Sequence, residues 1–241
     1  MSNQEKTINV TPTGDILVIR EGVAPDVFQY NGFKYTADST PALISLVQSK
    51  SVKEHCVIAY TENGFQAILN DQVFDRKQDR ITYGFKKSQQ YKEWQQILES
   101  GFVFNQKQFI DFLRRREPDE IIHVESLIAA IQNFKYVTNV SGDFTFDDRN
   151  NYTFAFKVGD AEGTVRLPQF IYADIEIYNE SDFVQKMELE LEVQKPKSEG
   201  ERLLFALTCP KLPRYQKEAV KYEIDKVKTE LDGYLIVAGS I

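Results

Sequence analysis

Histidine, cysteine and tryptophan are scarce in this chain. Its 241 residues include two histidines, two cysteines and one tryptophan. With only His55 and His123 available, a zinc site would have to rely on carboxylates or cysteines. Cys56 and Cys209 are too few for a secreted disulfide scaffold. We therefore expect no metal site and a reducing compartment, the cytoplasm.

Long apolar runs are also missing. No apolar stretch approaches the roughly 18 residues that span a bilayer. Residues 1–15 lack a basic segment followed by an apolar run, so they do not read as a signal peptide. We expect no membrane partner.

Phosphate-binding loops and nucleophile motifs are absent as well. The chain has neither the closely spaced glycines of dinucleotide and Walker loops nor a G-x-S-x-G serine motif. Lysine and arginine number 29 against 36 acidic residues, a formal charge of −7 that argues against a broad nucleic-acid-binding face. The sequence therefore predicts no cofactor, no catalytic residue and no enzyme activity.

Alternating apolar residues and tight turns predict strands in the first third of the chain. Val27–Tyr30 and Phe33–Tyr35 flank Asn31–Gly32, a pair typical of a type I′ hairpin turn. A second hairpin is predicted over Cys56–Leu69, again with Asn-Gly in the turn, and Arg80–Phe85 alternates as a further strand.

Capping residues and apolar spacing predict the helices. Thr40 is expected to be the first N-cap, with Pro41 at the first helical position. The predicted helices are Ala42–Gln48, Ser88–Glu99, one that Asn105 caps and Pro118 ends, Val124–Phe134, and Pro213–Leu231, whose expected core stripe is Val220, Ile224, Val227 and Leu231.

The second half of the chain is predicted to consist mainly of long strands. Met187–Val193 alternates apolar and acidic residues, which is typical of an antiparallel sheet with one exposed face. We expect an α+β fold of mostly antiparallel sheets, several packed helices, and a long C-terminal helix followed by a closing strand at Tyr234–Val237. Residues 1–36 would be N-terminal strands and 37–241 an α+β domain with a seam near 135–142. The remaining predicted strands are Tyr152–Lys157, Thr164–Leu167, Phe170–Tyr178, Phe183–Val193 and Arg202–Leu207.

The densest basic cluster is Arg114, Arg115 and Arg116, with Lys107 one or two helical turns earlier. Arginines in the last turn of a helix complement the helix dipole, which is a sufficient structural reason for them. The functional alternative is a ligand- or phosphate-binding site. We take these four residues as the candidate binding site.

Several short motifs follow one another in a characteristic order. They are Arg80–Ser88 with Tyr91–Trp94, Gln108–Leu113, Glu120–Ile122, Leu167–Phe170 and Tyr234–Gly239. This order resembles the YfdQ-like family of phage and prophage proteins. The resemblance covers roughly residues 37–241, and it departs at Leu69–Asp71, where relatives often have a tyrosine-histidine step. It implies a phage gene expressed in the bacterial host cytoplasm and offers no catalytic residues.

Three functions remain open at this point. The first is a non-enzymatic binding or inhibitor protein acting in host takeover, with counter-defence as one such role. It would bind a host protein or sequester a signalling nucleotide. The second is a DNA-binding accessory of phage replication or recombination. The third is a Mg²⁺-dependent nuclease, because Pro25-Asp26 and Asp75-Arg76-Lys77 imitate a nuclease pattern. A sheet edge could also pair two copies into a homo-oligomer.

Overall fold

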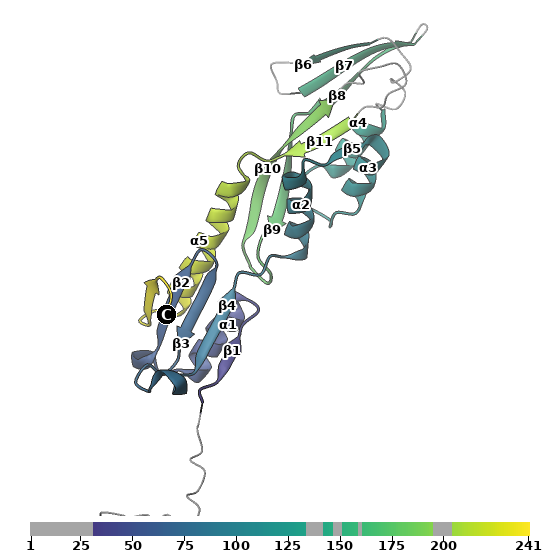
Figure 1. Ribbon diagram of the computed structural model, residues 1–241. Helices are drawn as coiled ribbons and strands as arrows, with labels where there is room; N and C mark the ends of the chain where they lie inside the picture. Colours follow the sequence, from purple (N-terminus) through teal and green to yellow (C-terminus); the bar gives the residue numbers. More distant parts are fainter. Residues whose placement is uncertain (1–30, 134–141, 147–150, 159–160, 195–203) are drawn as a thin grey trace, which may run out of the picture. The chain divides into compact units, whose positions relative to one another are not determined.

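The fold is α+β, as the sequence predicts. The computed structural model describes residues 31–133, 142–146, 151–158, 161–194 and 204–241. Internal contacts divide the chain into Met1–Asn31 and Gly32–Ile241, and the second unit contains the described helices and strands. These strands form three sheets (Figure 1).

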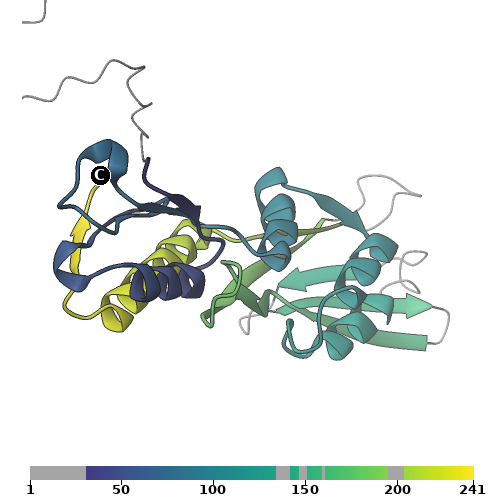
Figure 2. The same ribbon diagram turned by 90° about the horizontal axis from the view of Figure 1, so that it is seen from below.

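The first sheet has the strand order β1-β4-β3-β2-β12. The three central strands are antiparallel, whereas both edge strands, β1 and β12, run parallel to their neighbours. Helices α1 and α5 lie together on one face of this sheet (Figure 2). Its elements are β1 (Lys34–Thr36), α1 (Thr40–Lys50), β2 (Val57–Thr61), β3 (Gly64–Ile68), β4 (Arg80–Gly84), α5 (Leu212–Glu230) and β12 (Leu235–Ala238).

The second sheet is antiparallel, with the order β5-β11-β10-β9. In β10, Met187, Leu189 and Leu191 are buried while Glu188 and Glu190 are partly exposed, so the predicted apolar and acidic faces are confirmed. Helices α2, α3 and α4 complete its core. The elements are α2 (Gln89–Ser100), β5 (Val103–Asn105), α3 (Gln106–Arg114), α4 (Val124–Asn133), β9 (Phe170–Glu176), β10 (Val184–Gln194) and β11 (Leu204–Thr208).

The third sheet is antiparallel, with the order β6-β7-β8. Its strands are β6 (Gly142–Phe146), β7 (Asn151–Val158) and β8 (Ala161–Pro168), and short 3₁₀ turns occur at Lys53–His55 and Asp75–Lys77. The predicted seam near 135–142 falls almost wholly outside the described residues.

Helix α5 contributes to two apolar cores. Leu212, Tyr215 and Ala219 belong to the core of the second sheet, and Val227 and Leu231 close the core of the first. The helix is therefore shared between both sheets. None of the described helices is long and apolar enough to cross a membrane.

The predicted capping residues of α2 and α3 are confirmed. The Ser88 hydroxyl accepts a hydrogen bond from Tyr91 N at 2.9 Å, and Gly101 ends α2 with a φ of 63°. Asn105 and Gln108 form a reciprocal capping box at the start of α3. These side chains satisfy backbone groups that have no partner within the helix.

Two local predictions are wrong. Ser39, and not Thr40, caps α1, because its hydroxyl accepts from Ala42 N while Thr40 is already the first helical residue. Gly32 lacks the positive φ angle that a type I′ turn requires at its second central position. The Phe33–Tyr35 arm contributes to β1, which pairs in parallel with β4, and Val27–Tyr30 lies outside the described residues.

Gly64 and Gly101 provide a matched test of backbone constraint. Both have positive φ, but a Cβ at Gly64 would overlap the Tyr83 carbonyl oxygen, whereas a Cβ at Gly101 meets nothing within 4 Å. We expect Gly101→Ala to lower the free energy of unfolding by about 1 kcal/mol through backbone strain alone. Gly64→Ala should cost at least twice as much, measured by urea denaturation. Equal losses would contradict the packing of the β2–β3 turn against β4.

Candidate functional site

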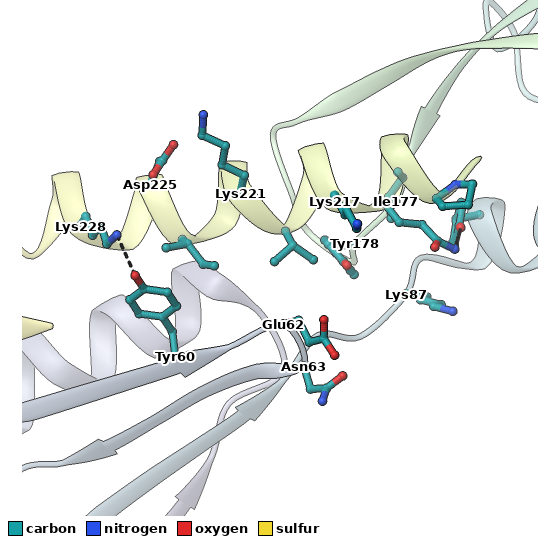
Figure 3. A pocket seen from close by; sticks show the side chains of 15 residues that line it. Tyr60, Glu62, Asn63, Lys87, Ile177, Tyr178, Lys217, Lys221, Asp225 and Lys228 are labelled. Carbon is teal, nitrogen blue, oxygen red and sulfur yellow. Dashed lines mark hydrogen bonds between the residues drawn. The ribbon is translucent and has the colours of Figure 1, made fainter. Parts of the chain in front are cut away.

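A groove of about 580 Å³ runs along α5. The tip of the β2–β3 hairpin forms part of its opposite side, together with Lys87 before α2 and Ile177 and Tyr178 after β9 (Figure 3). From α5, the groove receives Pro213, Gln216, Lys217, Val220, Lys221, Ile224, Asp225 and Lys228.

The helical repeat explains which α5 residues face the groove. Residues three, four and seven positions apart share one side of a helix, so positions 213, 217, 220, 224 and 228 line up. Val227 and Leu231 are buried, as the predicted core stripe requires. Val220 and Ile224 are partly buried and pack against the two cores, as the predicted stripe requires, and their remaining surface forms an apolar wall of the groove.

Four lysines and two carboxylates line the groove. Lys228 Nζ donates to the Tyr60 hydroxyl at 3.1 Å and lies 4.6 Å from the centre of its ring (Figure 3). Lys87 Nζ donates to Gln95 Oε1 at 2.9 Å. Both ammonium groups are therefore held in place near the groove.

Lys217 and Lys221 differ from the other two groove lysines. Neither forms a hydrogen bond or ion pair with any described residue, and both are exposed on α5. In Figure 3, Lys217 and Lys228 extend toward the hairpin side, whereas Lys221 and Asp225 extend from the other flank of α5. Positive charge thus follows the helix on both sides of its apolar wall.

The groove tyrosines do not offer open ring faces. Tyr91 is fully buried, and its hydroxyl accepts from Gln216 Nε2 at 2.6 Å. Tyr178 is 7% exposed and stacks on Phe85 at 4.9 Å between ring centres. Burial raises the pKa of Tyr91 and raises that of Tyr178 to about 12, so both hydroxyls stay protonated at neutral pH.

A buried carboxylate fixes the middle of α5 beside the groove. Glu223 is 1% exposed and accepts a hydrogen bond from the Ser181 hydroxyl at 2.5 Å. The Ser181 backbone N–H in turn donates to Glu176 Oε1 at 3.0 Å. This chain of polar contacts joins α5 to the turn between β9 and β10.

Arg116 of the predicted basic cluster lies among acidic and aromatic side chains. Its side chain is 8% exposed, with Nη2 2.5 Å from Glu93 Oε2 and Nη1 3.8 Å from Glu120 Oε1. Its guanidinium carbon is 4.5 Å from the centre of the Phe112 ring. The Arg116 hydrogen bond lowers the pKa of Glu93. This arginine is held in a structural network.

Lys107, Arg114 and Arg115 lie exposed on or just after α3. Arg115 Nε donates to the Asp111 carbonyl oxygen at 3.1 Å, which matches the helix-end interpretation. None of these residues lines the α5 groove. The structure therefore separates the predicted cluster into one buried arginine and three exposed cations.

The other chemically interesting residues lie apart. Burial raises the pKa of the Cys56 thiol and raises that of Cys209 to about 11. Asp75, one half of the nuclease pattern, pairs with Arg80, and Asp26 lies outside the described residues. Within the described part of the chain, no group of three or more His, Cys, Asp and Glu side chains could hold a metal ion.

No family model, curated protein or solved structure matches this chain. The assignment of the groove as a candidate site therefore depends on its geometry alone.

The sequence pattern did not single out the groove lysines. Lys217, Lys221 and Lys228 recur at intervals of four and seven, which is also the spacing of any exposed flank of an amphipathic helix. Lys87 and the β2–β3 hairpin come from distant parts of the chain. The sequence does show that one side of the predicted C-terminal helix combines lysines with aliphatic residues. Only the fold shows which other segments face that side.

The network around Arg116 predicts a specific loss of stability. Glu120 is 3% exposed and accepts from Trp94 Nε1 and from Glu117 N, the latter at 2.9 Å. Glu120→Ala would leave these donors and a buried guanidinium without an acceptor, so we expect a loss of about 3 kcal/mol in the free energy of unfolding.

Two variants control this measurement by urea denaturation. Glu120→Gln keeps an acceptor for Trp94 and should lose less than the alanine variant. Glu117→Ala removes an exposed side chain, so we expect a change of about 0.5 kcal/mol or less. If Glu120→Ala cost no more than Glu117→Ala, the network would not be the reason for the burial of Arg116.

Proposed function

We propose that this is a non-enzymatic binding protein whose α5 groove holds an acidic segment of another protein. The observation that supports this proposal is a long groove with an aliphatic wall, which is lined by four lysines and two carboxylates. Complementary charge guides association and sets the register of a bound partner, while apolar contact supplies affinity.

The dimensions of the groove suit a short stretch of polypeptide. Its α5 wall extends from Pro213 to Lys228, roughly 22 Å at 1.5 Å per residue. A segment with alternating acidic and apolar side chains can contact the lysines and the aliphatic wall together.

The groove chemistry also favours a polypeptide. Nucleotide sites commonly stack the base on an aromatic face, but Tyr91 and Tyr178 are buried, and the ring of Tyr60 lies beneath Lys228. Glu62 and Asp225 would also repel phosphate groups. A protein segment can offset these carboxylates with a donor of its own.

The protonation states support a role in binding. The thiolate is the reactive form of cysteine, and burial keeps the Cys56 and Cys209 thiols protonated at neutral pH. Burial likewise keeps the hydroxyls of Tyr91 and Tyr178 protonated at neutral pH. The groove offers ammonium, amide and apolar groups, which suit recognition.

The resemblance to YfdQ-like phage proteins suggests where and when this binding takes place. In this proposal the protein acts in the bacterial host cytoplasm during takeover by a phage. The acidic segment belongs to a host protein, and components of host defence systems are candidates.

Binding to a labelled peptide of glutamate and leucine, long enough to span the groove, tests the proposal. Fluorescence anisotropy should show binding that weakens with salt. The double variant Lys217→Glu/Lys221→Glu should weaken it about tenfold or more, because two attractions become repulsions. Lys107→Glu, a matched change on α3, should alter affinity less than about twofold.

The same assay with ATP and with single-stranded DNA separates the alternatives. Tight binding of ATP without binding of the peptide would replace the proposed partner with a nucleotide. DNA binding that is lost in Lys107→Glu and shows a steep salt dependence would favour the replication accessory. Equal peptide binding by the double variant and the wild type would contradict the groove as the site.

A further inference from the structure

In the part of the chain that the structure describes, no strand pairs with the outer edge of β12. Edge strands are ordinarily shielded by charge, shortness or a covering segment, because their unpaired backbone groups attract other strands. From Tyr234 to Ile241 the sequence carries no charged side chain and no proline. Leu235 is 57% exposed and Val237 36% exposed.

The other edge strands of the first two sheets are shorter than β12 or are covered. β1 and β5 are three residues long, and β1 carries Lys34. The outer edge of β9 is covered by Glu120–Ile122, since Asp174 N donates to Glu120 O at 2.8 Å and Ile122 N to Tyr172 O at 3.0 Å. β12 has no such cover among the described residues.

The backbone geometry of β12 fixes which groups are available. Gly239 N donates to Tyr60 O of the adjacent β2 at 2.9 Å. Because backbone groups alternate in direction along a strand, Leu235 and Val237 also direct theirs toward β2. The N–H and C=O groups of Ile236 and Ala238 therefore face the free edge.

We propose that β12 pairs antiparallel with β12 of a second copy of this chain, with Val237 on the two-fold axis. Ile236 and Ala238 of each copy then exchange hydrogen bonds with Ala238 and Ile236 of the other. The two Val237 residues form a non-hydrogen-bonded pair, with Cα atoms about 4.5 Å apart. This assignment goes beyond the groove and does not depend on its function.

A second copy fits this edge better than a charged partner. The strand is uncharged, so self-pairing brings no like charges together along the edge despite the formal charge of −7. On the sheet face opposite α1 and α5, Val237 meets its counterpart and Leu235 lies diagonal to the other Val237. Pairing therefore covers apolar side chains that are exposed in one copy.

Sedimentation equilibrium of the full chain tests the pairing. We expect a dimer for the wild type and a monomer for Ala238→Pro, which removes an outward N–H and leaves the Gly239 bond to β2 intact. Val237→Lys should also give a monomer through charge repulsion. Thr82→Lys, a matched change at an exposed position of the same sheet, should remain a dimer.

Cross-linking tests the register. Val237→Cys should form a disulfide-linked dimer on mild oxidation, because the expected Cα separation suits a disulfide, whereas Thr82→Cys and the wild type should not. A monomeric wild type at every soluble concentration would overturn the proposal. So would a dimer that persists in both Ala238→Pro and Val237→Lys.

Discussion

Two cores share the helix α5, and this sharing constrains much of the structure. The helix has 19 residues, roughly 28 Å at 1.5 Å per residue. Its first half packs into the core of the second sheet and its end into that of the first. Phe85 packs against both cores and stacks on Tyr178, so the segment between β4 and α2 reinforces the same connection.

The groove follows from this arrangement. Tyr215, Ala219 and Val227 face the cores, so the neighbouring flank of α5 remains partly exposed. Glu223 is tied to Ser181 and fixes the rotation of the helix about its axis. That rotation presents Val220 and Ile224 as an apolar wall and sets lysines along it. Folding therefore places the groove without any dedicated loop.

Local signals made much of the fold predictable. The caps at Ser88 and Asn105, the ending glycine at Gly101 and the alternation of β10 each act within a few residues, and each is confirmed. The error at Ser39 is a one-residue ambiguity between two adjacent hydroxyl side chains. The parallel pairing of β1 with β4 depends on long-range contacts, which local turn residues do not report.

The candidate site was harder to predict for the same physical reason. A dense run such as Arg114–Arg116 is conspicuous in sequence, yet folding buries Arg116 between Glu93 and Glu120. The groove instead joins Lys87, the β2–β3 hairpin and α5, which are far apart in the chain. A single sequence shows the composition of such a surface, but tertiary packing decides which residues meet.

Lysine acetylation footprinting tests the central claim, that a partner occupies the α5 groove. Acetylation rates would be measured by mass spectrometry with and without a saturating glutamate–leucine peptide. The account predicts strong protection of Lys217 and Lys221 and unchanged modification of Lys107, because only the first two line the groove. Protection of Lys107 with unchanged rates at Lys217 and Lys221 would contradict it.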